Sequence, residues 1–312
     1  MTQQPSTTPN APTPAVEIRG LVRRYGKTEA VDGLNLTVRQ GRCFGLFGRN
    51  GAGKSTTMKC LLNHLRPSAG VVKVFGKEPQ YDEVGVKTHI GYVPEVVAFH
   101  PWMSAREVLD YSASFRRHWN RDVEMDLLAR FDMDPNKRVD SMSKGMRSQL
   151  GLVCAVCPEP DLLLLDEPTS GLDPIVRREF LQTVIGAYLD AAPGQRTVLV
   201  STHLIHEWEG LIDEFTIIDK GRDILTLESE IARQRCKRVH LRWMNGNRPA
   251  NLGEFGVVQA SREDGVTTIL TNEYSDDLHA RLKALNPAEV EVENLTLEEI
   301  FIATGTAKGG RL

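Results

Sequence analysis

The apolar residues of this chain follow two spacings, one typical of buried strands and one typical of helices. Continuous apolar runs, which indicate strands buried on both faces, occur at 43–47, 162–165, 197–200 and 215–218. Helical spacing follows the first run at 56–65 and the second at 174–190. This repetition of strand and helix predicts a parallel α/β core.

A second kind of strand precedes this core. Apolar and polar residues alternate at 16–21 and at 34–38, which predicts two antiparallel strands. Gly26 and the pair Asp32-Gly33 lie between them and predict the turns of the connection. We therefore expect a small antiparallel β subdomain beside the parallel core.

Two further regions differ from the core. Between residues 103 and 130 the spacing is helical, with Ser104 as a predicted N-cap and Glu107 at the capping-box position, so a helical subdomain is predicted at about 96–160. After residue 230, alternating runs at 239–243, 256–260, 266–270 and 290–292 combine with helical runs at 276–285 and 297–303. Thr296 and Glu299 predict a capping box for the last helix. The predicted organisation is a tail at 1–14, a core domain at 15–229 and a small α+β appendage at 230–312.

Composition limits the kinds of partner and the cellular compartment to be expected. The 312 residues carry a net charge of −3, with a pI near 6.3, so no bulk charge favours nucleic acid as a partner. The odd number of cysteines, five, argues against a disulfide framework and for a reducing compartment. Cys154 and Cys157 form a CxxC pair inside an apolar helical stretch with no second pair nearby, which predicts small core residues and disfavours a metal or redox pair.

The chain contains no apolar run long enough to span a bilayer, and the Pro- and Thr-rich start lacks the apolar core of a signal peptide. We predict a disordered tail and a cytoplasmic location. Any role at the membrane then needs a partner.

Residues 48–55, with the sequence GRNGAGKS, fit the phosphate-binding pattern GxxxxGK[ST] and lie between a predicted strand and a predicted helix. Glycines let backbone N–H groups turn toward phosphates, Lys54 supplies a positive charge and the Ser55 hydroxyl is a Mg²⁺ ligand. The pattern predicts a P-loop NTPase core. Its predicted nucleotide-binding residues are Gly48, Asn50, Gly51, Ala52, Gly53, Lys54, Ser55 and Thr56.

Two carboxylates follow the apolar run at 162–165. Asp166 is the predicted second Mg²⁺ ligand, and Glu167 is the predicted general base that polarises the water attacking the γ-phosphorus. The alternative is a strand that ends in two acids by chance, which the phosphate-binding loop earlier in the chain disfavours.

With these motifs, the sequence Ser143-Lys144-Gly145-Met146-Arg147 before the acidic strand resembles the signature of the ATP-binding cassette (ABC) transporter nucleotide-binding subunit. Residues 170–173 resemble its D-loop, and 201–203 resemble its switch-histidine motif. The resemblance covers about 16–225 and rests on the order of five motifs. It implies ATP and Mg²⁺ as cofactors.

The resemblance also implies roles for single residues. Tyr25 aligns with the aromatic residue that stacks on adenine, against the alternative of an ordinary strand tyrosine. His203 is expected to donate to the γ-phosphate and to orient Glu167, while Ser143, Gly145 and Asp173 belong to motifs of the composite site. Ser143 is expected to cap a helix that faces ATP held by an opposite subunit, so each site needs two chains, either a homodimer or a paired cassette subunit.

Two positions depart from the common family pattern. The signature has Lys144 where glycine is usual, and that lysine either adds charge at the γ-phosphate or is solvated. Glu95 replaces the usual glutamine and is predicted near Mg²⁺ or a catalytic water. Both departures resemble the export branch of drug, antibiotic-peptide and sodium efflux cassettes. The apolar stretch at 96–102 either contacts a membrane subunit or packs into the core.

The resemblance implies an ATPase subunit, peripheral on the cytoplasmic face of the membrane, that powers a separately encoded permease, an exporter by its branch. The alternative is a soluble ABC-type ATPase acting on ribosomes or nucleic acid. A metabolic kinase would not explain the signature, Asp173 and His203 together. The transported substrate, the permease and the role of the appendage are not encoded in these motifs.

Overall fold

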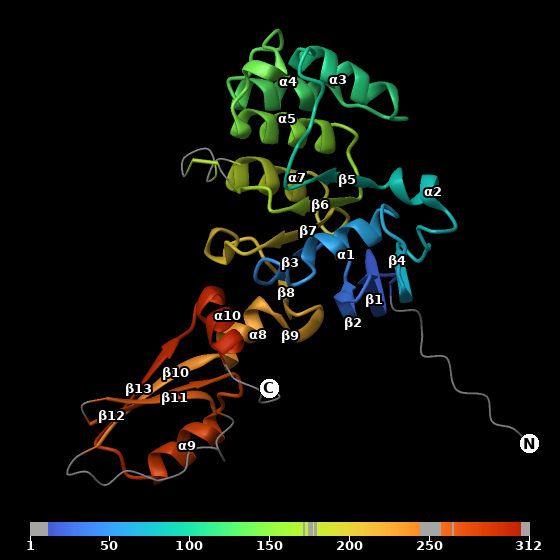
Figure 1. The fold of residues 1–312 in the computed structure, drawn as a ribbon. Helices are drawn as coiled ribbons and strands as arrows, with labels where there is room; N and C mark the ends of the chain where they lie inside the picture. Colours follow the sequence, from blue (N-terminus) through green and yellow to red (C-terminus); the bar gives the residue numbers. More distant parts are fainter. Residues whose placement is uncertain are drawn as a thin grey trace, which may run out of the picture.

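The computed structural model describes residues 12–170, 172–173, 177, 180–243, 257–263 and 265–306 (Figure 1). Its centre is a six-stranded sheet with the order β5-β6-β7-β3-β8-β9, in which β9 is antiparallel to β8 and the other neighbours are parallel. The predicted parallel α/β core is confirmed. The strands are β3 (Cys43–Phe47), β5 (Ile90–Val93), β6 (Leu162–Asp166), β7 (Thr197–Thr202), β8 (Glu214–Asp219) and β9 (Arg222–Glu228).

Alternate side chains of each central strand enter two separate hydrophobic clusters. On β6, Leu163 and Leu165 pack on the side of the helical layer, whereas Leu162 and Leu164 pack against the antiparallel sheet. All four are fully buried. Burial on both faces explains why these strands are continuous apolar runs in the sequence.

The antiparallel sheet has the order β2-β1-β4, with β1 (Val16–Tyr25), β2 (Thr28–Val38) and β4 (Ala69–Val74). Both predicted strands are present and longer than predicted, and Gly26 lies in the turn between them. The prediction of a turn at Asp32-Gly33 is wrong. These residues lie within β2. The pairing of β1 with β2 shifts register between Leu21 and Val22, which face this part of β2, so Gly33 belongs to an irregularity within the strand.

Helix α1 (Lys54–Leu61) packs between this sheet and the central one. It ends four residues before the predicted end at residue 65. Asn63 adopts a left-handed backbone conformation with φ of 56°, which a helix does not continue through.

The helical layer contains α3 (Ala105–Ser114), α4 (Arg121–Arg130) and α5 (Lys144–Val156), and the short α2 (Glu83–Lys87) precedes β5. Ser104 and Glu107 form the predicted capping box. The helical region predicted at 103–130 is two helices, because the Asn120 side chain caps a new helix by accepting from two backbone N–H groups.

A buried carboxylate joins α3 to α4. Glu124, only 1% exposed, forms ion pairs with Arg106 and Arg121 and accepts a hydrogen bond from Trp119 Nε1 at 2.6 Å. Burial alone raises the pKa of Glu124, but these hydrogen bonds and positive charges outweigh it, so its net pKa lies below the ordinary value.

Replacing Glu124 with Gln is expected to lower the free energy of unfolding by about 2 kcal/mol, because two arginines lose their shared carboxylate. The folded pKa is depressed, so the wild-type contribution is complete above about pH 5 and is lost as pH falls through the titration of the carboxylate. Urea unfolding at pH 7 and at pH 4 measures both effects. Asp126→Asn, which removes an exposed pair with Arg130 on the same helix, is the control. Equal losses in the two variants would contradict this account.

Between β6 and β7, the predicted helix at 174–190 is described only in part. Residues 174–176 and 178–179 lie outside the described residues, and the remainder forms a π-helix, η2 (Phe180–Ile185), followed by α7 (Gly186–Asp190). After β7, a short 3₁₀-helix, η3 (Ile205–Glu207), leads toward β8.

The C-terminal region forms a second, four-stranded antiparallel sheet with the order β11-β12-β10-β13. Its elements are α8 (Ser229–Arg235), β10 (Lys237–Arg242), β11 (Val257–Glu263), β12 (Val266–Thr271), α9 (Asp276–Ala284), β13 (Glu289–Asn294) and α10 (Leu297–Thr306). Helix α9 covers one face through a small cluster of its own that includes Val239, Leu241, Leu278 and Leu282. All predicted elements of this region are present, although residue 256 of one predicted strand and the tail up to residue 11 lie outside the described residues.

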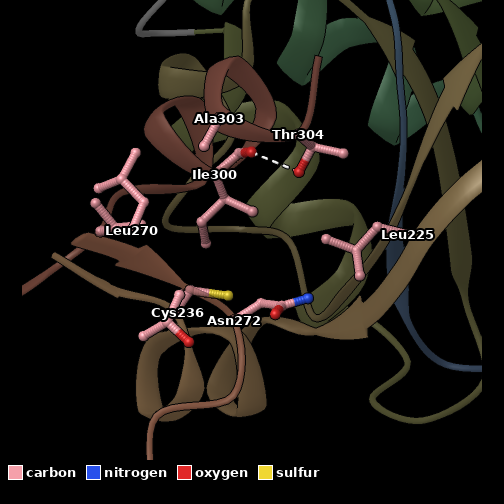
Figure 2. A pocket seen from close by; sticks show the side chains of 9 residues that line it. Leu225, Cys236, Leu270, Asn272, Ile300, Ala303 and Thr304 are labelled. Atoms are coloured by element: carbon pink, nitrogen blue, oxygen red, sulfur yellow. Dashed lines mark hydrogen bonds between the residues drawn. The ribbon is translucent and has the colours of Figure 1, made fainter. Parts of the chain in front are cut away.

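Helix α10 returns from this sheet to the main body (Figure 1). It begins with the predicted Thr296–Glu299 capping box. Figure 2 shows Ile300 and Ala303 of α10 above Cys236 and Asn272, with Leu225 of the central sheet at the side. The space between them is about 10 Å³, enough for at most one water, so this junction is a packed interface rather than a ligand site.

Candidate functional site

A polar pocket of about 660 Å³ opens at the carboxyl ends of the central strands, beside the start of α1. In open α/β sheets this edge is where ligands bind. The pocket is lined by Ala30, Asn50, Gly51, Gly53, Lys54, Ser55, Thr56, Glu95, Glu167, Ser170 and His203. Residues far apart in the chain, from the phosphate-binding loop to the switch histidine, therefore meet at one place.

The loop before α1 depends on glycine at a close approach. Gly53 has φ of 108°, and a Cβ atom there would lie 2.6 Å from the carbonyl oxygen of Ala30. Both the conformation and the contact exclude other residues. The loop can therefore pass directly beneath β2 and start the helix with its backbone N–H groups directed at the pocket.

Lys54 is buried in this pocket and lies against Glu167. Its Nζ is 3.0 Å from Glu167 Oε1 and donates to the carbonyl oxygen of Gly48 at 2.8 Å. Both side chains are only 6% exposed. Each charge compensates the other, so the pair keeps a cation and a carboxylate together within one small volume.

Ser55 and Asp166 form the predicted metal-binding pair. Ser55 Oγ donates to Asp166 Oδ1 at 3.1 Å, and Ser201 Oγ donates to the same oxygen. Two neighbouring ligands of an octahedral Mg²⁺ lie about 2.9 Å apart, so the two oxygens fit such an ion. Within the described residues, no group of three or more His, Cys, Asp or Glu side chains forms a metal site.

Glu167 has a backbone conformation rare for a non-glycine residue, with φ of 47°. Its N–H donates to the carbonyl oxygen of Ser201 at 2.8 Å, which holds the strained turn. His203 Nδ1 lies 2.9 Å from Glu167 Oε2, and the His203 N–H donates to that same oxygen at 3.3 Å. The carboxylate is fixed from one side by His203 and from the other by Lys54.

Glu95 lines the pocket and its side chain is exposed. Burial raises the pKa of nearby Tyr92 to about 12, and the negative charges of Asp166 and Glu95 contribute to that rise. Glu95 and Asp166 thus both place negative charge near Tyr92. Its direct metal or catalytic role stays a prediction.

Several predicted residues lie away from the pocket lining. The Tyr25 ring, 45% exposed, faces the Arg23 guanidinium at 4.9 Å. Gly48 and Ala52 shape the loop instead of lining the pocket: Gly48 accepts from Lys54, and the Ala52 N–H donates to Arg49 at 3.1 Å.

The signature residues also lie outside this pocket. Ser143 caps α5 by accepting from the Met146 N–H at 3.2 Å, and Lys144 beside it is exposed. Gly145 packs toward Leu172, since a Cβ atom on Gly145 would lie 3.3 Å from that side chain. Asp173 is exposed. Gly171 of the D-loop motif lies outside the described residues.

The structure settles the interpretation of the cysteine pair, whereas the stretch at 96–102 is divided between packed and exposed residues. Cys157 is buried in the main core and Cys154 packs against that core, so both are core residues, and burial raises the pKa of the Cys154 thiol to about 11. In the 96–102 stretch, Val97 and Phe99 pack against the core, whereas Val96 and Trp102 are 70% and 64% exposed.

Sequence reasoning missed Ala30 and Ser170, which line the pocket, and Ser201, which donates to Asp166, as site members. Ala30 belongs to no motif. Ser170 belongs to the D-loop motif with Asp173, and Ser201 belongs to the switch-histidine motif with His203. Membership in these motifs was the sequence signal that could have identified both serines.

Comparison with known proteins decides the family. The model of the ABC transporter family matches residues 31–170. A fluoroquinolones export ATP-binding protein of Mycobacterium tuberculosis is 33% identical over 288 residues, which cover 90% of this chain and 93% of that protein. The chain is a member of the ABC transporter family. This ABC protein is an ATPase.

Other relatives agree with this membership. A daunorubicin resistance ATP-binding protein of Streptomyces coeruleorubidus is 32% identical, covering 92% of this chain and 95% of that one. Among solved structures, the ATP-binding subunit of an ABC transporter has a TM-score of 0.63 at 27% identity, covering 70% of this ABC protein and 92% of that chain. A bacterial ABC transporter cassette solved as a dimer shares the fold, with a TM-score of 0.61 at 19% identity, covering 69% of this chain and 98% of that one. The predicted fold class is confirmed.

Among the described residues of this ABC protein, no helix combines the length and apolar character needed to cross a membrane.

Proposed function

We propose that this chain is the ATP-hydrolysing subunit of an export-type transporter and drives a separately encoded transmembrane permease. The observation that carries the proposal is the pocket lined by Lys54, Ser55, Glu167 and His203, with Asp166 hydrogen-bonded to Ser55. Relatives named for export of fluoroquinolones and for transport of bacitracin support the export branch. The chain would then lie at the cytoplasmic face of the membrane.

The residues of the pocket divide the chemistry between them. Lys54 and the loop N–H groups hold the phosphates of ATP, while Ser55 and Asp166 hold Mg²⁺, which neutralises phosphate charge when bound. Glu167 accepts a proton from the attacking water as its oxygen bonds to the γ-phosphorus and the bond to ADP breaks. His203 keeps the Glu167 carboxylate oriented, which its two contacts with Oε2 support.

The proposed active assembly has two chains arranged head to tail. Ser143 caps a 13-residue helix whose first residue, Lys144, is exposed, and the first turn of that helix does not line the chain's own nucleotide pocket. The positive end of that helix suits the γ-phosphate of ATP bound to an opposite subunit. Tyr25, exposed at the end of β1, is proposed to stack on adenine, and Glu95 to hold a water or Mg²⁺ near the γ-phosphate.

A groove between α2, β5 and the end of α3 is the proposed permease contact. The groove, of about 820 Å³, is lined by Val84, Phe115, Arg116 and Arg117, among others. Val84 and Phe115 are 73% and 71% exposed. Arg116 donates to two backbone carbonyl oxygens, and among the described residues neither arginine forms an ion pair with a carboxylate. An apolar permease segment with an acidic residue fits this surface.

The test is co-purification from membranes. We expect the tagged chain, extracted in mild detergent, to carry a stoichiometric multi-span membrane protein that raises its ATPase rate. Recovery only in the soluble fraction, or with ribosomes or nucleic acid, would refute the transporter assignment and favour the soluble ATPase.

The groove itself is tested by replacing Phe115 with Asp, which is expected to lose the membrane protein while the basal ATPase rate stays within about twofold, because the groove is separate from the nucleotide pocket. Met125→Asp, at a similarly exposed apolar residue on α4, is the matched control and should retain the partner. Retention of the partner by Phe115→Asp would place the contact elsewhere.

A further inference from the structure

The end of strand β1 carries an arginine against the ring of Tyr25. The central carbon of the Arg23 guanidinium lies over that ring, 4.9 Å from its centre. The two residues are two positions apart on β1, a spacing that places side chains on the same face of a strand. Because Tyr25 is 45% exposed, the ring face opposite the guanidinium is the one that a flat ligand can reach.

The register of the antiparallel sheet places this ring beside the nucleotide pocket. Arg23 pairs with Val31 of β2, and Tyr25 pairs with Thr28. Ala30, which lies between these two partners on β2, lines the nucleotide pocket. The end of β1 therefore borders the side of the pocket to which Ala30 belongs.

The segment that follows α1 holds Arg23 in place. Arg23 Nη1 donates to the carbonyl oxygen of Arg66 at 2.9 Å. The neighbouring main chain is attached to the same segment, since the Ser68 N–H donates to the carbonyl oxygen of Val22 at 2.7 Å and the Arg24 N–H donates to Ser68 Oγ at 3.1 Å. Both the side chain of Arg23 and the backbone on each side of it are thus anchored to residues 66–68.

Helix α1 connects this anchor to the phosphate-binding loop. The helix begins with Lys54 and Ser55, which line the pocket, and the anchoring segment follows its other end. Burial raises the pKa of Cys60, in the last turn of α1, to about 11, and the positive charge of Arg23 acts in the opposite direction. Arg23 therefore lies beside the helix whose first turn lines the pocket.

Hydrogen bonding alone does not account for a guanidinium at this position. Arg23 Nε is buried without a hydrogen-bond partner among the described residues. A buried N–H without a partner costs free energy that an apolar side chain of similar length avoids. The negative face of an aromatic ring attracts a planar cation and offsets part of that cost. The contact with Tyr25 is therefore the interaction that favours arginine here.

We propose that Arg23 is a positioning residue for the nucleotide base: its guanidinium covers one face of the Tyr25 ring and holds the ring so that the other face stacks on the base. This role rests on the adenine stacking proposed above for Tyr25. A ring that is already held loses less conformational freedom when the base binds, so Arg23 strengthens nucleotide binding without touching the nucleotide.

The test is calorimetric binding of MgADP, which is not consumed, and of magnesium pyrophosphate, which has the phosphates without the base. Arg23→Met keeps an apolar side chain of similar length and is expected to weaken MgADP binding about fivefold. Binding of pyrophosphate is expected to stay within about twofold, because the phosphate contacts are intact. Pyrophosphate binding also reports that each variant is folded.

The matched control is Arg24→Met. Arg24 is the next residue along the chain and forms an exposed pair with Glu29 at 2.7 Å, so its replacement should change neither affinity. Arg23→Lys keeps the charge but loses the planar group, and it is expected to retain only part of the wild-type affinity for MgADP.

A double-mutant cycle shows whether Arg23 acts through the ring. Tyr25→Ala is expected to weaken MgADP binding by roughly tenfold, and adding Arg23→Met to it should cause no further loss. A further fivefold loss without the ring would overturn the positioning role, as would an equal loss of pyrophosphate affinity in Arg23→Met. Unchanged MgADP binding in Tyr25→Ala would refute the stacking itself, whereas a loss in Tyr25→Ala with none in Arg23→Met would refute the positioning role alone.

Discussion

Replacing Glu167 with Gln lowers the steady-state rate of ATP hydrolysis by at least about a hundredfold, because the attacking water loses its proton acceptor. Glutamine nearly matches the size of glutamate and leaves the phosphate contacts of Lys54 and the loop in place. Nucleotide binding is therefore retained, and two chains stay associated around ATP that is not consumed. Phosphate release and size-exclusion chromatography with MgATP measure the two expected effects.

The matched control is Asp161→Asn, at the residue just before the start of the same strand. Asp161 is an exposed carboxylate that lies 2.6 Å from a nitrogen of His89, far along β6 from the pocket. This variant should hydrolyse ATP at the wild-type rate. A Glu167→Gln variant that turns over within a few-fold of wild type would show that another group is the general base.

Replacing Lys54 with Ala has two effects. Nucleotide affinity falls by about a hundredfold or more, because the cation for the β and γ phosphates is lost. The free energy of unfolding also falls, by about 3 kcal/mol, because the Glu167 carboxylate stays buried without its counter-charge. Fluorescent nucleotide binding and urea unfolding measure these two quantities.

Because Lys54 pairs with Glu167, the effect of Lys54→Ala on stability can be separated from its effect on nucleotide binding. Adding Glu167→Gln to Lys54→Ala removes the unpaired carboxylate and should restore most of the lost stability, while nucleotide binding stays weak. Lys59→Ala, an exposed lysine on the same helix, is the control and should change neither quantity. A stability loss that is the same with and without Glu167→Gln would contradict the buried pair.

The sequence predicted the strands in which every residue is buried. Strands buried on both faces, such as β3 and β6, are continuous apolar runs, and their prediction is confirmed. Strands β4, β5 and β9 were missed, since β4 and β9 carry many exposed positions and β5 is only four residues long. Their pairing depends on neighbours distant in the chain, which local spacing does not encode.

The same limit applies to the site. Lys54, Ser55, Asp166 and Glu167 follow strands or begin a helix, so motif and position together predicted where they gather. Ala30 lines the pocket from β2, and no motif marks it in the sequence.

The central claim is that MgATP is hydrolysed at a site completed by two chains. Its most direct test is the rate of phosphate release per chain, measured at saturating MgATP over a range of protein concentrations that spans dissociation of the dimer. The account predicts that the rate per chain rises with concentration and then reaches a plateau. A rate per chain that stays constant down to concentrations where sedimentation shows only monomers with MgATP bound would contradict it.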